Sequence, residues 1–371
     1  MKIFHVSDTH LGFSEYNKID PETGLNQREQ DFYNAWDQII AAIFTHQPDV
    51  VIHAGDLFHT PRPSNRAIHV AVESIQKISD AGIPMVIVSG NHETPRIRLT
   101  GSIFETISLF PNICTAFTNQ YERFRIKSVD FHCIPHFSLS EDLNAAVEKL
   151  HIKSDSQANV LVTHGAWAGK NMYGMGEFNE QRLPDIEGVT GLTFDYIALG
   201  HYHRHIAVKD HAWYSGSTER TSLNEHNSQC GYLLVDPDVK EYDYHTIKTR
   251  PMIKVPAIDC RDLTTTDIYS ELEKLNTPDF QNAIVQLSLH NIEDDAFVKL
   301  DIRAIDDIFN NAFVLEKQLL RKAHDGQQCS KNAKIESLPV EFERYIENID
   351  HTELDAAKLK KLGAAYLADE G

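Results

Sequence analysis

Short apolar runs alternate with longer amphipathic stretches along the first 248 residues of the chain. The runs are rich in β-branched residues and end in Gly, Ser, Asp or His, which indicates buried strands that lead into tight loops. We predict strands at 2–6, 50–54, 85–88, 131–134, 160–163, 196–199, 212–214, 232–235 and 242–246. We predict helices at 27–46, 64–80, 101–109 and 141–150, with Ser64 and Ser140 as N-caps. This alternation is typical of an α/β layered domain.

The pattern changes after Arg250-Pro251. Predicted strands at 252–258, 283–289 and 313–320 alternate with predicted helices at 266–275 and 300–310, which favours a small α+β unit. A polar segment typical of a linker follows, and then two short amphipathic helices that cannot bury their apolar faces alone. These helices either dock on their own chain or form a partner-binding tail. We therefore predict domains at 1–248 and 249–322, a linker at 323–337 and a helical tail at 338–371.

The composition is that of an ordinary globular chain, with 42% hydrophobic residues among 371. No apolar stretch approaches the roughly 18 residues that a membrane span requires. We expect no removable signal peptide, because the first strand leads straight into Asp8 and His10, and we expect a cytoplasmic location. The five single cysteines fit neither a disulfide framework nor a zinc ribbon. The net charge of −19 argues against coating nucleic acid by bulk attraction but leaves room for a nuclease whose basic groups are local, and our hypothesis is that a partner captures the DNA.

Five predicted strands end in residue types that bind metal ions. In open α/β sheets ligands collect outside the carboxyl ends of the strands, so these motifs should converge. Residues two apart on an extended chain point to the same side, which would bring together the two ligands within the first motif and the two within the last. The glycines at 55, 90 and 200 would allow close backbone approach. The motifs are Asp8-Thr-His10, Gly55-Asp56, Gly90-Asn91-His92-Glu93, His164-Gly165 and Gly200-His201-Tyr202-His203.

The candidate ligands comprise two carboxylates, one amide oxygen and four imidazoles. They are Asp8, Asp56, Asn91, His10, His164, His201 and His203. Mixed oxygen and nitrogen ligands favour manganese, iron or zinc over calcium, and the absence of thiolate from the set weakens the case for zinc. Seven ligands exceed what one ion uses beside a water and a substrate. We therefore expect two ions, with Asp56 as the best candidate for a bridge between them.

The charges of such a site favour a phosphate ester as the substrate. Two dications bring four positive charges, and Asp8 and Asp56 neutralise two of them. One hydroxide and one phosphodiester monoanion would match the rest. His92 follows a candidate ligand directly and should point away from it on a strand end, which suits it to protonate the leaving alkoxide.

Two segments beside the motifs carry arginines without carboxylates. Arg62 and Arg66 lie between Leu57 and Val72, and Arg96 and Arg98 follow the third motif. They would give an acidic protein a basic rim that contacts a phosphate backbone. In the alternative interpretation they balance nearby acidic helices.

The five motifs together resemble the calcineurin-like metallophosphoesterase superfamily. Within it, the segments 4–12, 55–60, 198–201 and 214–220 are similar to the SbcD or meiotic recombination eleven-type nucleases of double-strand-break repair. The sequence motifs that carry the resemblance cover residues 1 to about 248. The small domain and the tail are similar only in the order of their predicted elements. Glu93 departs from the pattern, because bacterial members commonly have Asp there.

This resemblance implies an αββα sandwich with a small α+β capping domain that binds DNA and a C-terminal helical tail. It implies that Asp8, His10, Asp56 and His203 hold one Mn²⁺, and that Asp56, Asn91, His164 and His201 hold a second, with Mg²⁺ or Fe²⁺ as alternatives. It also implies that His92 is the catalytic histidine and that His59 orients it or guides the DNA strand.

The implied activities are 3'-5' exonuclease action on duplex DNA and endonuclease action on single-stranded or hairpin DNA. The implied assembly is a homodimer bound to an SbcC-type coiled-coil ATPase. One alternative is a phosphatase or cyclic-nucleotide phosphodiesterase with the same metal core. A protein phosphatase, however, would have Arg-Gly soon after Gly-Asp, where this chain has Leu57-Phe-His59. The other alternative is a catalytically silent scaffold for an ATPase.

Overall fold

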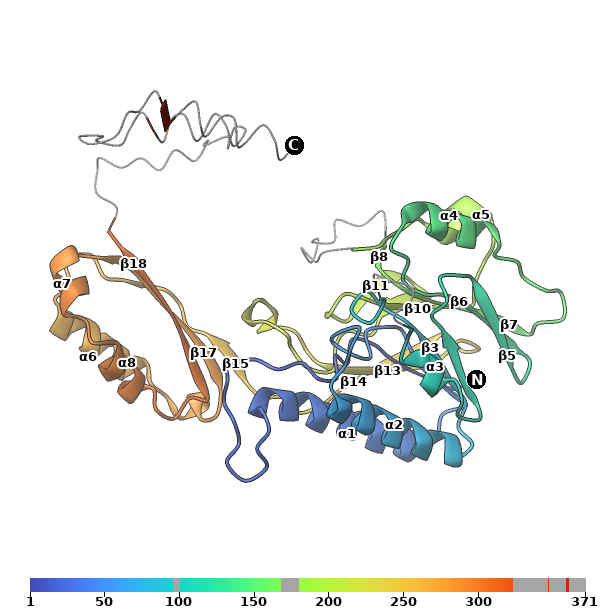
Figure 1. Ribbon diagram of the computed structural model, residues 1–371, viewed down its shortest axis with the longest axis horizontal. Coiled ribbons are helices and arrows are strands. Elements are labelled where there is room, and N and C mark those ends of the chain that lie inside the picture. The colour runs from blue at the N-terminus through green and yellow to red at the C-terminus, as the bar shows by residue number, and fades with distance from the viewer. Residues whose placement is uncertain (96–100, 168–179, 323–345, 347–357, 360–371) are drawn as a thin grey trace.

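The computed structural model describes residues 1–95, 101–167, 180–322, 346 and 358–359 (Figure 1). The predicted linker, nearly all of the predicted tail, Arg96 and Arg98 lie outside the described residues. Within the described part of the chain, no helix has the length and apolar character needed to cross a membrane. The cytoplasmic location stays a prediction.

Two six-stranded sheets form the centre of the larger unit (Figure 1). The strands at the middle of each sheet are parallel. The first sheet has antiparallel pairs at one end and a parallel strand at the other, and the second sheet has an antiparallel pair at each end. The first sheet has the order β14 (Glu241–Thr246), β13 (Gly231–Asp236), β1 (Ile3–Val6), β2 (Val50–His53), β3 (Met85–Val88) and β4 (Ile113–Ala116). The second has the order β11 (Ile206–Lys209), β12 (Ala212–Tyr214), β10 (Tyr196–Gly200), β7 (Ala158–His164), β6 (Val129–Ile134) and β5 (Glu122–Ile126). β8 (Ala166–Trp167) and β9 (Arg182–Leu183) form a separate parallel pair.

The side chains of the central strands alternate between two cores. Ile52 and Val160 belong to the core between the sheets, whereas Val51 packs with Trp36 on the helical side of the first sheet. Such alternation is the period of two expected of a strand buried on both faces. The first sheet is covered by α1 (Gln27–His46), α2 (Asn65–Asp80) and α3 (Phe104–Ile107). The second is covered by α4 (Ser140–Glu148) and α5 (Ile186–Thr190). The result is the expected αββα sandwich.

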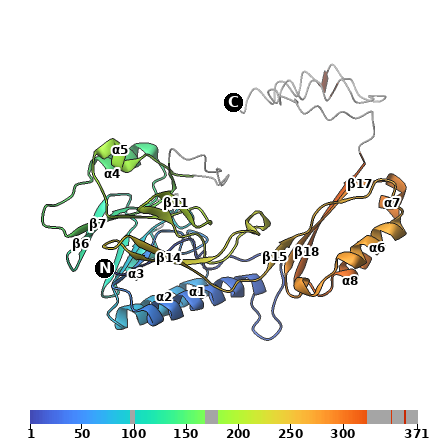
Figure 2. The same ribbon diagram turned by 180° about the vertical axis from the view of Figure 1, so that it is seen from behind.

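A third sheet forms a smaller unit beside the sandwich (Figure 1 and Figure 2). Its central strand β17 pairs in parallel with the three others, and its helices pack on one face through Ile268, Leu272 and Ile305. The strands are β15 (Met252–Lys254), β16 (Ile258–Asp259), β17 (Ile284–Ile292) and β18 (Val314–Arg321). The helices are α6 (Thr265–Leu275), α7 (Asp294–Lys299) and α8 (Ile302–Ile308), with η3 (Pro278–Phe280) as a 3-10 turn. A second 3-10 turn, η2 (Leu223–Glu225), lies between β12 and β13 of the larger unit.

Arg250 joins the two units. Its Nε and Nη2 donate to Asp31 of α1 at 2.6 and 2.7 Å, and its guanidinium carbon lies 4.0 Å from the ring centre of Phe313. Nη1 donates to the Asn282 carbonyl at 3.0 Å. One bidentate side chain therefore fixes the start of the smaller unit to the first helix of the sandwich.

Several predicted elements differ from the observed ones. The predicted strand 252–258 is two strands, because Pro256 has no N–H to continue the ladder. The predicted helix 300–310 begins later, at Ile302, with Asp301 as its N-cap, and α7 precedes it. The edge strands β4, β5 and β11 were not predicted. Edge strands carry weaker patterns, as the polar β5 sequence Glu-Arg-Phe-Arg-Ile illustrates.

The two predicted N-caps have different outcomes. Ser64 caps α2, since its hydroxyl accepts a hydrogen bond from the Ala67 amide at 3.1 Å. Ser140 does not cap α4 but is its first helical residue. The N-cap there is Leu139, whose side chain has no acceptor to offer.

Candidate metal centre

The loops that follow β1 and β2 are bonded to each other. The Asp8 amide donates to the Gly55 carbonyl at 3.0 Å, and the His10 amide donates to the Asp56 carbonyl at 3.0 Å. In the second sheet, the Gly165 amide donates to the Gly200 carbonyl at 3.1 Å. The backbone thus holds the first two motifs side by side, and likewise the last two.

Four of the seven ligand residues have a left-handed rather than an extended backbone. The φ angles are 52° for Asp8, 43° for His10, 55° for Asp56 and 112° for His201. The expectation that an extended chain aligns neighbouring ligands is therefore wrong. The side chains converge because the chain turns sharply after each strand, in a conformation that non-glycine residues seldom adopt.

The three glycines confirm the expected close approach. A Cβ on Gly55 would overlap the His164 ring, one on Gly90 would overlap the Asp56 carboxylate, and one on Gly200 would overlap the Ala54 carbonyl. Of the three, Gly55 has a positive φ, at 96°. Gly90 and Gly200 are thus required for space rather than for backbone freedom.

Asp8, His10 and His203 form one potential metal-binding group. Their ligand atoms all lie within 4.8 Å of one another. Nε2 of His10 lies 3.0 Å from Nε2 of His203 and 4.0 Å from an Asp56 oxygen. All of these side chains are buried.

A second group adjoins the first. The ligand atoms of Asp8, Asp56 and His164 lie within 4.8 Å of one another. Nε2 of His164 lies 3.2 Å from Asp56 Oδ2 and 3.0 Å from Asn91 Oδ1, and the His201 ring centre is 5.4 Å from that of His164. The structure therefore brings together all seven predicted ligands. Asp8 belongs to both groups, and the Asp56 carboxylate faces both, at 3.2 Å from Nε2 of His164 and 4.0 Å from Nε2 of His10.

Burial and charge set the pKa values in this cluster. Burial lowers the pKa of His10 well below its usual value and raises the pKa of Asp8. Burial opposes ionisation of the Asp56–His164 pair, but their mutual attraction outweighs it. The pKa of Asp56 therefore falls well below its usual value, and that of His164 rises to about 10. A divalent cation could replace the proton that His164 carries, because buried carboxylates require a compensating positive charge.

The ligand histidines are also held at their second nitrogen. Nδ1 of His164 lies 2.8 Å from the Ala54 carbonyl, and Nδ1 of His203 lies 2.7 Å from Glu225 Oε1. Nε2 of His201 lies 3.3 Å from Glu180 Oε1. Acceptors at these atoms fix the ring orientation and tautomer, an arrangement common at metal sites. The donor set and its surroundings fit divalent metal ions.

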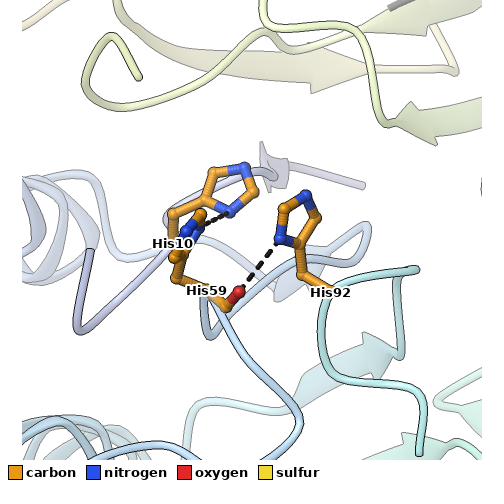
Figure 3. A group of neighbouring side chains, drawn as sticks. All are labelled: His10, His59 and His92. Carbon is orange, nitrogen blue, oxygen red and sulfur yellow. Dashed lines mark hydrogen bonds between the residues drawn. The ribbon is translucent and has the colours of Figure 1, made fainter. Parts of the chain in front are cut away.

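His92 lies beside the cluster, next to His10 and His59 (Figure 3). Its Nδ1 is 2.9 Å from the His59 carbonyl oxygen, and its amide donates to Asp56 Oδ1 at 3.0 Å. Since a carbonyl can only accept, Nδ1 carries a proton and Nε2 is the nitrogen suited to proton transfer. The imidazole of His59 lies beside both rings: its Nδ1 is 3.5 Å from His10 Nδ1, and its ring centre is 5.0 Å from that of His92 (Figure 3). The ligand atoms of His10, His59 and His92 lie within 4.8 Å of one another, so these three histidines also form a potential metal-binding group. The His59 ring packs edge-on against Phe13.

The backbone carbonyl and the imidazole of His59 make separate contacts, the first to His92 and the second to His10. His59→Ala keeps the carbonyl that orients His92 and removes the ring beside the ligand His10. If the protein has the Mn²⁺-dependent DNA cleavage that the resemblance implies, the cleavage rate should fall by about 10–100-fold at limiting Mn²⁺, as for other groups that support a metal ligand, and recover at saturating Mn²⁺. Single-turnover rates across a Mn²⁺ titration test this. A loss that persists at saturation would assign the ring itself to the reaction.

The predicted arginine rim is only partly described. Arg62 and Arg66 are exposed. Arg66 lies in the first turn of α2 and lines a groove between α1 and α2 with Asp37 and Glu73. Glu73 itself pairs with Lys77 at 2.8 Å. A role of Arg62 and Arg66 in DNA binding stays a prediction.

Three carboxylates at the site were not found from the sequence. Glu93, noted there only as a departure from the family pattern, is buried, and its Oε1 accepts from the Leu57 and Gly90 amides, both at 3.2 Å. Burial and the Asp56 charge raise the pKa of Glu93 to about 8. Glu180 and Glu225 hold His201 and His203 from 21 and 22 residues away. No local pattern signals a contact across such a separation.

Facing sheets with helices outside, and a buried carboxylate and imidazole cluster at the strand ends, define a metal-dependent phosphoesterase. The model of the calcineurin-like phosphoesterase family matches residues 1–205, and the chain belongs to this family. The predicted resemblance to the superfamily is thereby confirmed.

Several curated relatives carry the name DNA double-strand break repair protein Mre11. The chain is 29% identical to the one from Haloferax volcanii, over 67% of this chain and 53% of the relative. It is 28% identical to the one from Methanocaldococcus jannaschii, over 72% of this chain and 69% of the relative. It is also 28% identical to the one from Thermoplasma acidophilum, over 99% of this chain and 90% of the relative. The chain thus spans about half the length of the first of these relatives and most of the third.

Proposed function

We propose that the protein is a manganese-dependent DNA nuclease that hydrolyses phosphodiesters with two metal ions. The observation that carries this proposal is the convergence of Asp8, His10 and His203 with Asp56 and His164 at one place. The names of the relatives, which refer to repair of DNA double-strand breaks, support DNA as the substrate.

The side chains divide the work between binding and proton transfer. Asp8, His10, Asp56 and His203 would hold one ion, and Asp56, Asn91, His164 and His201 the other. When bound, such ions polarise the phosphate oxygens and supply a hydroxide at neutral pH. His92, held through Nδ1 by the His59 carbonyl, presents Nε2 to protonate the leaving oxygen. The buried surroundings strengthen each of these electrostatic contacts.

The proposal extends to the rest of the assembly. Residues 249–322 would form a capping domain that contacts DNA, and residues 338–371 would bind an SbcC-type ATPase. The protein would act as a homodimer. The acidity of the chain, with a net charge of −19, supports a partner that captures DNA on its behalf.

A gel assay on end-labelled duplex and hairpin DNA tests this function. We expect shortening of the duplex from its 3' ends and opening of the hairpin in Mn²⁺, with none in EDTA, because chelation removes the ions that the cluster would hold. Mg²⁺ in place of Mn²⁺ tests the choice of metal. Faster turnover of p-nitrophenyl phosphate than of DNA would identify a phosphatase instead. Binding of two Mn²⁺ without cleavage of either substrate, with or without an ATPase partner, would identify a silent scaffold.

A further inference from the structure

A carboxylate outside the predicted ligand set holds one of the ligands. Oε1 of Glu225 lies 2.7 Å from Nδ1 of His203, whose Nε2 faces His10 at 3.0 Å. With Nδ1 bound to a carboxylate, His203 presents Nε2 to the Asp8–His10–His203 group.

Glu225 is itself fixed by its surroundings. Thr221 donates to it twice, from its amide to Oε2 at 2.8 Å and from its hydroxyl to Oε1 at 3.1 Å. The residue is 8% exposed. The carboxylate is therefore held by three contacts and has little freedom to leave the imidazole.

The turn that contains Glu225 packs against the smaller unit. Glu225 is the last residue of η2, and Leu223 is the first. Leu223 is buried in a cluster with Met252 of β15, Ile284 of β17 and Phe313, which precedes β18. One three-residue turn thus contacts a metal ligand with one side chain and the third sheet with another.

A second loop from the same ligand group reaches the third sheet. Tyr16 follows the motif that contains His10 and packs against the Leu223 cluster. Its hydroxyl donates to Glu316 of β18 at 2.7 Å. The loop that follows His10 and the turn that contacts His203 therefore both lie against the same sheet.

We propose that Glu225 is a positioning residue for His203. Through the Leu223–Glu225 turn, the metal affinity of the Asp8–His10–His203 group would depend on the position of the third sheet against that turn. This inference rests on the proposed function in taking Asp8, His10 and His203 as ligands of one of two ions. A displacement of the third sheet, for example by DNA or a partner, would thereby loosen or tighten one ion while sparing the other.

Calorimetric titration of the full chain with Mn²⁺ tests the proposal. In Glu225→Ala we expect one Mn²⁺ to bind about 10–100-fold more weakly while the other keeps its affinity. Glu225→Gln should recover part of the loss, because its amide oxygen still accepts from Nδ1 of His203, whereas its NH2 group cannot accept from the Thr221 amide. Leu223→Ala should weaken the same ion by a smaller factor, although it removes none of the hydrogen bonds. Without the coupling, Leu223→Ala would leave both affinities unchanged.

Glu187→Gln is the matched control. Glu187 lies 3.0 Å from His211, a carboxylate–imidazole pair with side-chain exposure of 14% against 11% for Glu225, and neither residue belongs to the ligand cluster. The Glu187→Gln protein should bind both ions with the wild-type affinities. Unchanged affinity for both ions in Glu225→Ala would overturn the proposal, as would equal weakening of both, or equal losses in the Ala and Gln variants.

Two further outcomes remain decisive. Should Glu225→Ala not fold, Leu223→Ala decides alone, by whether one ion weakens selectively. Should the wild type bind only one Mn²⁺, the two-metal function fails. The effect of Glu225→Ala on that single ion would still support or overturn the positioning role.

Discussion

Asp56→Ala should empty both metal sites and reduce DNA cleavage by about a thousand-fold or more. The reason is its position: one oxygen lies 3.2 Å from Nε2 of His164 and 4.0 Å from Nε2 of His10, which belong to different ligand groups. Lewis-acid stabilisation by bound metal is worth several kcal/mol, and about 1.4 kcal/mol corresponds to a factor of ten in rate. Mn²⁺ stoichiometry by mass spectrometry of the metal content, beside cleavage rates, measures both effects.

Asp130→Asn provides the control for loss of a buried carboxylate. Asp130 is fully buried and pairs with Arg125 at 2.8 Å, and it belongs to neither ligand group. It should keep both ions if it folds. Asp56→Asn, which preserves volume, separates a loss of ligand charge from a packing defect. One tightly retained ion in Asp56→Ala would contradict the bridging position.

His92→Gln should lower the cleavage rate by about 10²–10⁴-fold while both ions remain bound. A fall in rate of this size is expected when an enzyme loses its general acid. His92 lies at the edge of the cluster, and its Nδ1 donates to the His59 carbonyl at 2.9 Å rather than to a ligand atom. Single-turnover cleavage at saturating Mn²⁺ measures the rate, and calorimetry measures the stoichiometry.

His46→Gln is the companion variant, because His46 is also half-buried and hydrogen-bonded, to Tyr232 at 3.0 Å, at the end of α1. It should cleave at the wild-type rate. A His92→Gln protein that loses an ion would make His92 a ligand. One that cleaves normally would remove it from the reaction.

The sequence predicts the fold, and it predicts those metal ligands that come directly after a strongly apolar strand. Asp8, Asn91 and His164 could be found because each lies at or just beyond the end of a buried apolar run. Their convergence follows from the topology, since parallel strands end at the same edge. The central strands and α1 were predicted within a residue or two, because these elements are deeply buried and strongly patterned.

What the sequence does not reveal are contacts made between distant segments. The left-handed backbone at Asp8 and Asp56 depends on hydrogen bonds between two loops, and no local residue preference indicates it. Glu225 reaches His203 from a 3-10 turn that has no periodic pattern. Ser140 looks like an N-cap in sequence, yet the helix begins one residue earlier than such a cap would require.

The most direct measurement of the central claim is anomalous diffraction from crystals grown with Mn²⁺. The account predicts two manganese peaks roughly 3.5–4 Å apart, a spacing typical of two-metal sites, with the Asp56 carboxylate between them and His92 bound to neither. A single peak, or two peaks that Asp56 does not touch, would contradict it.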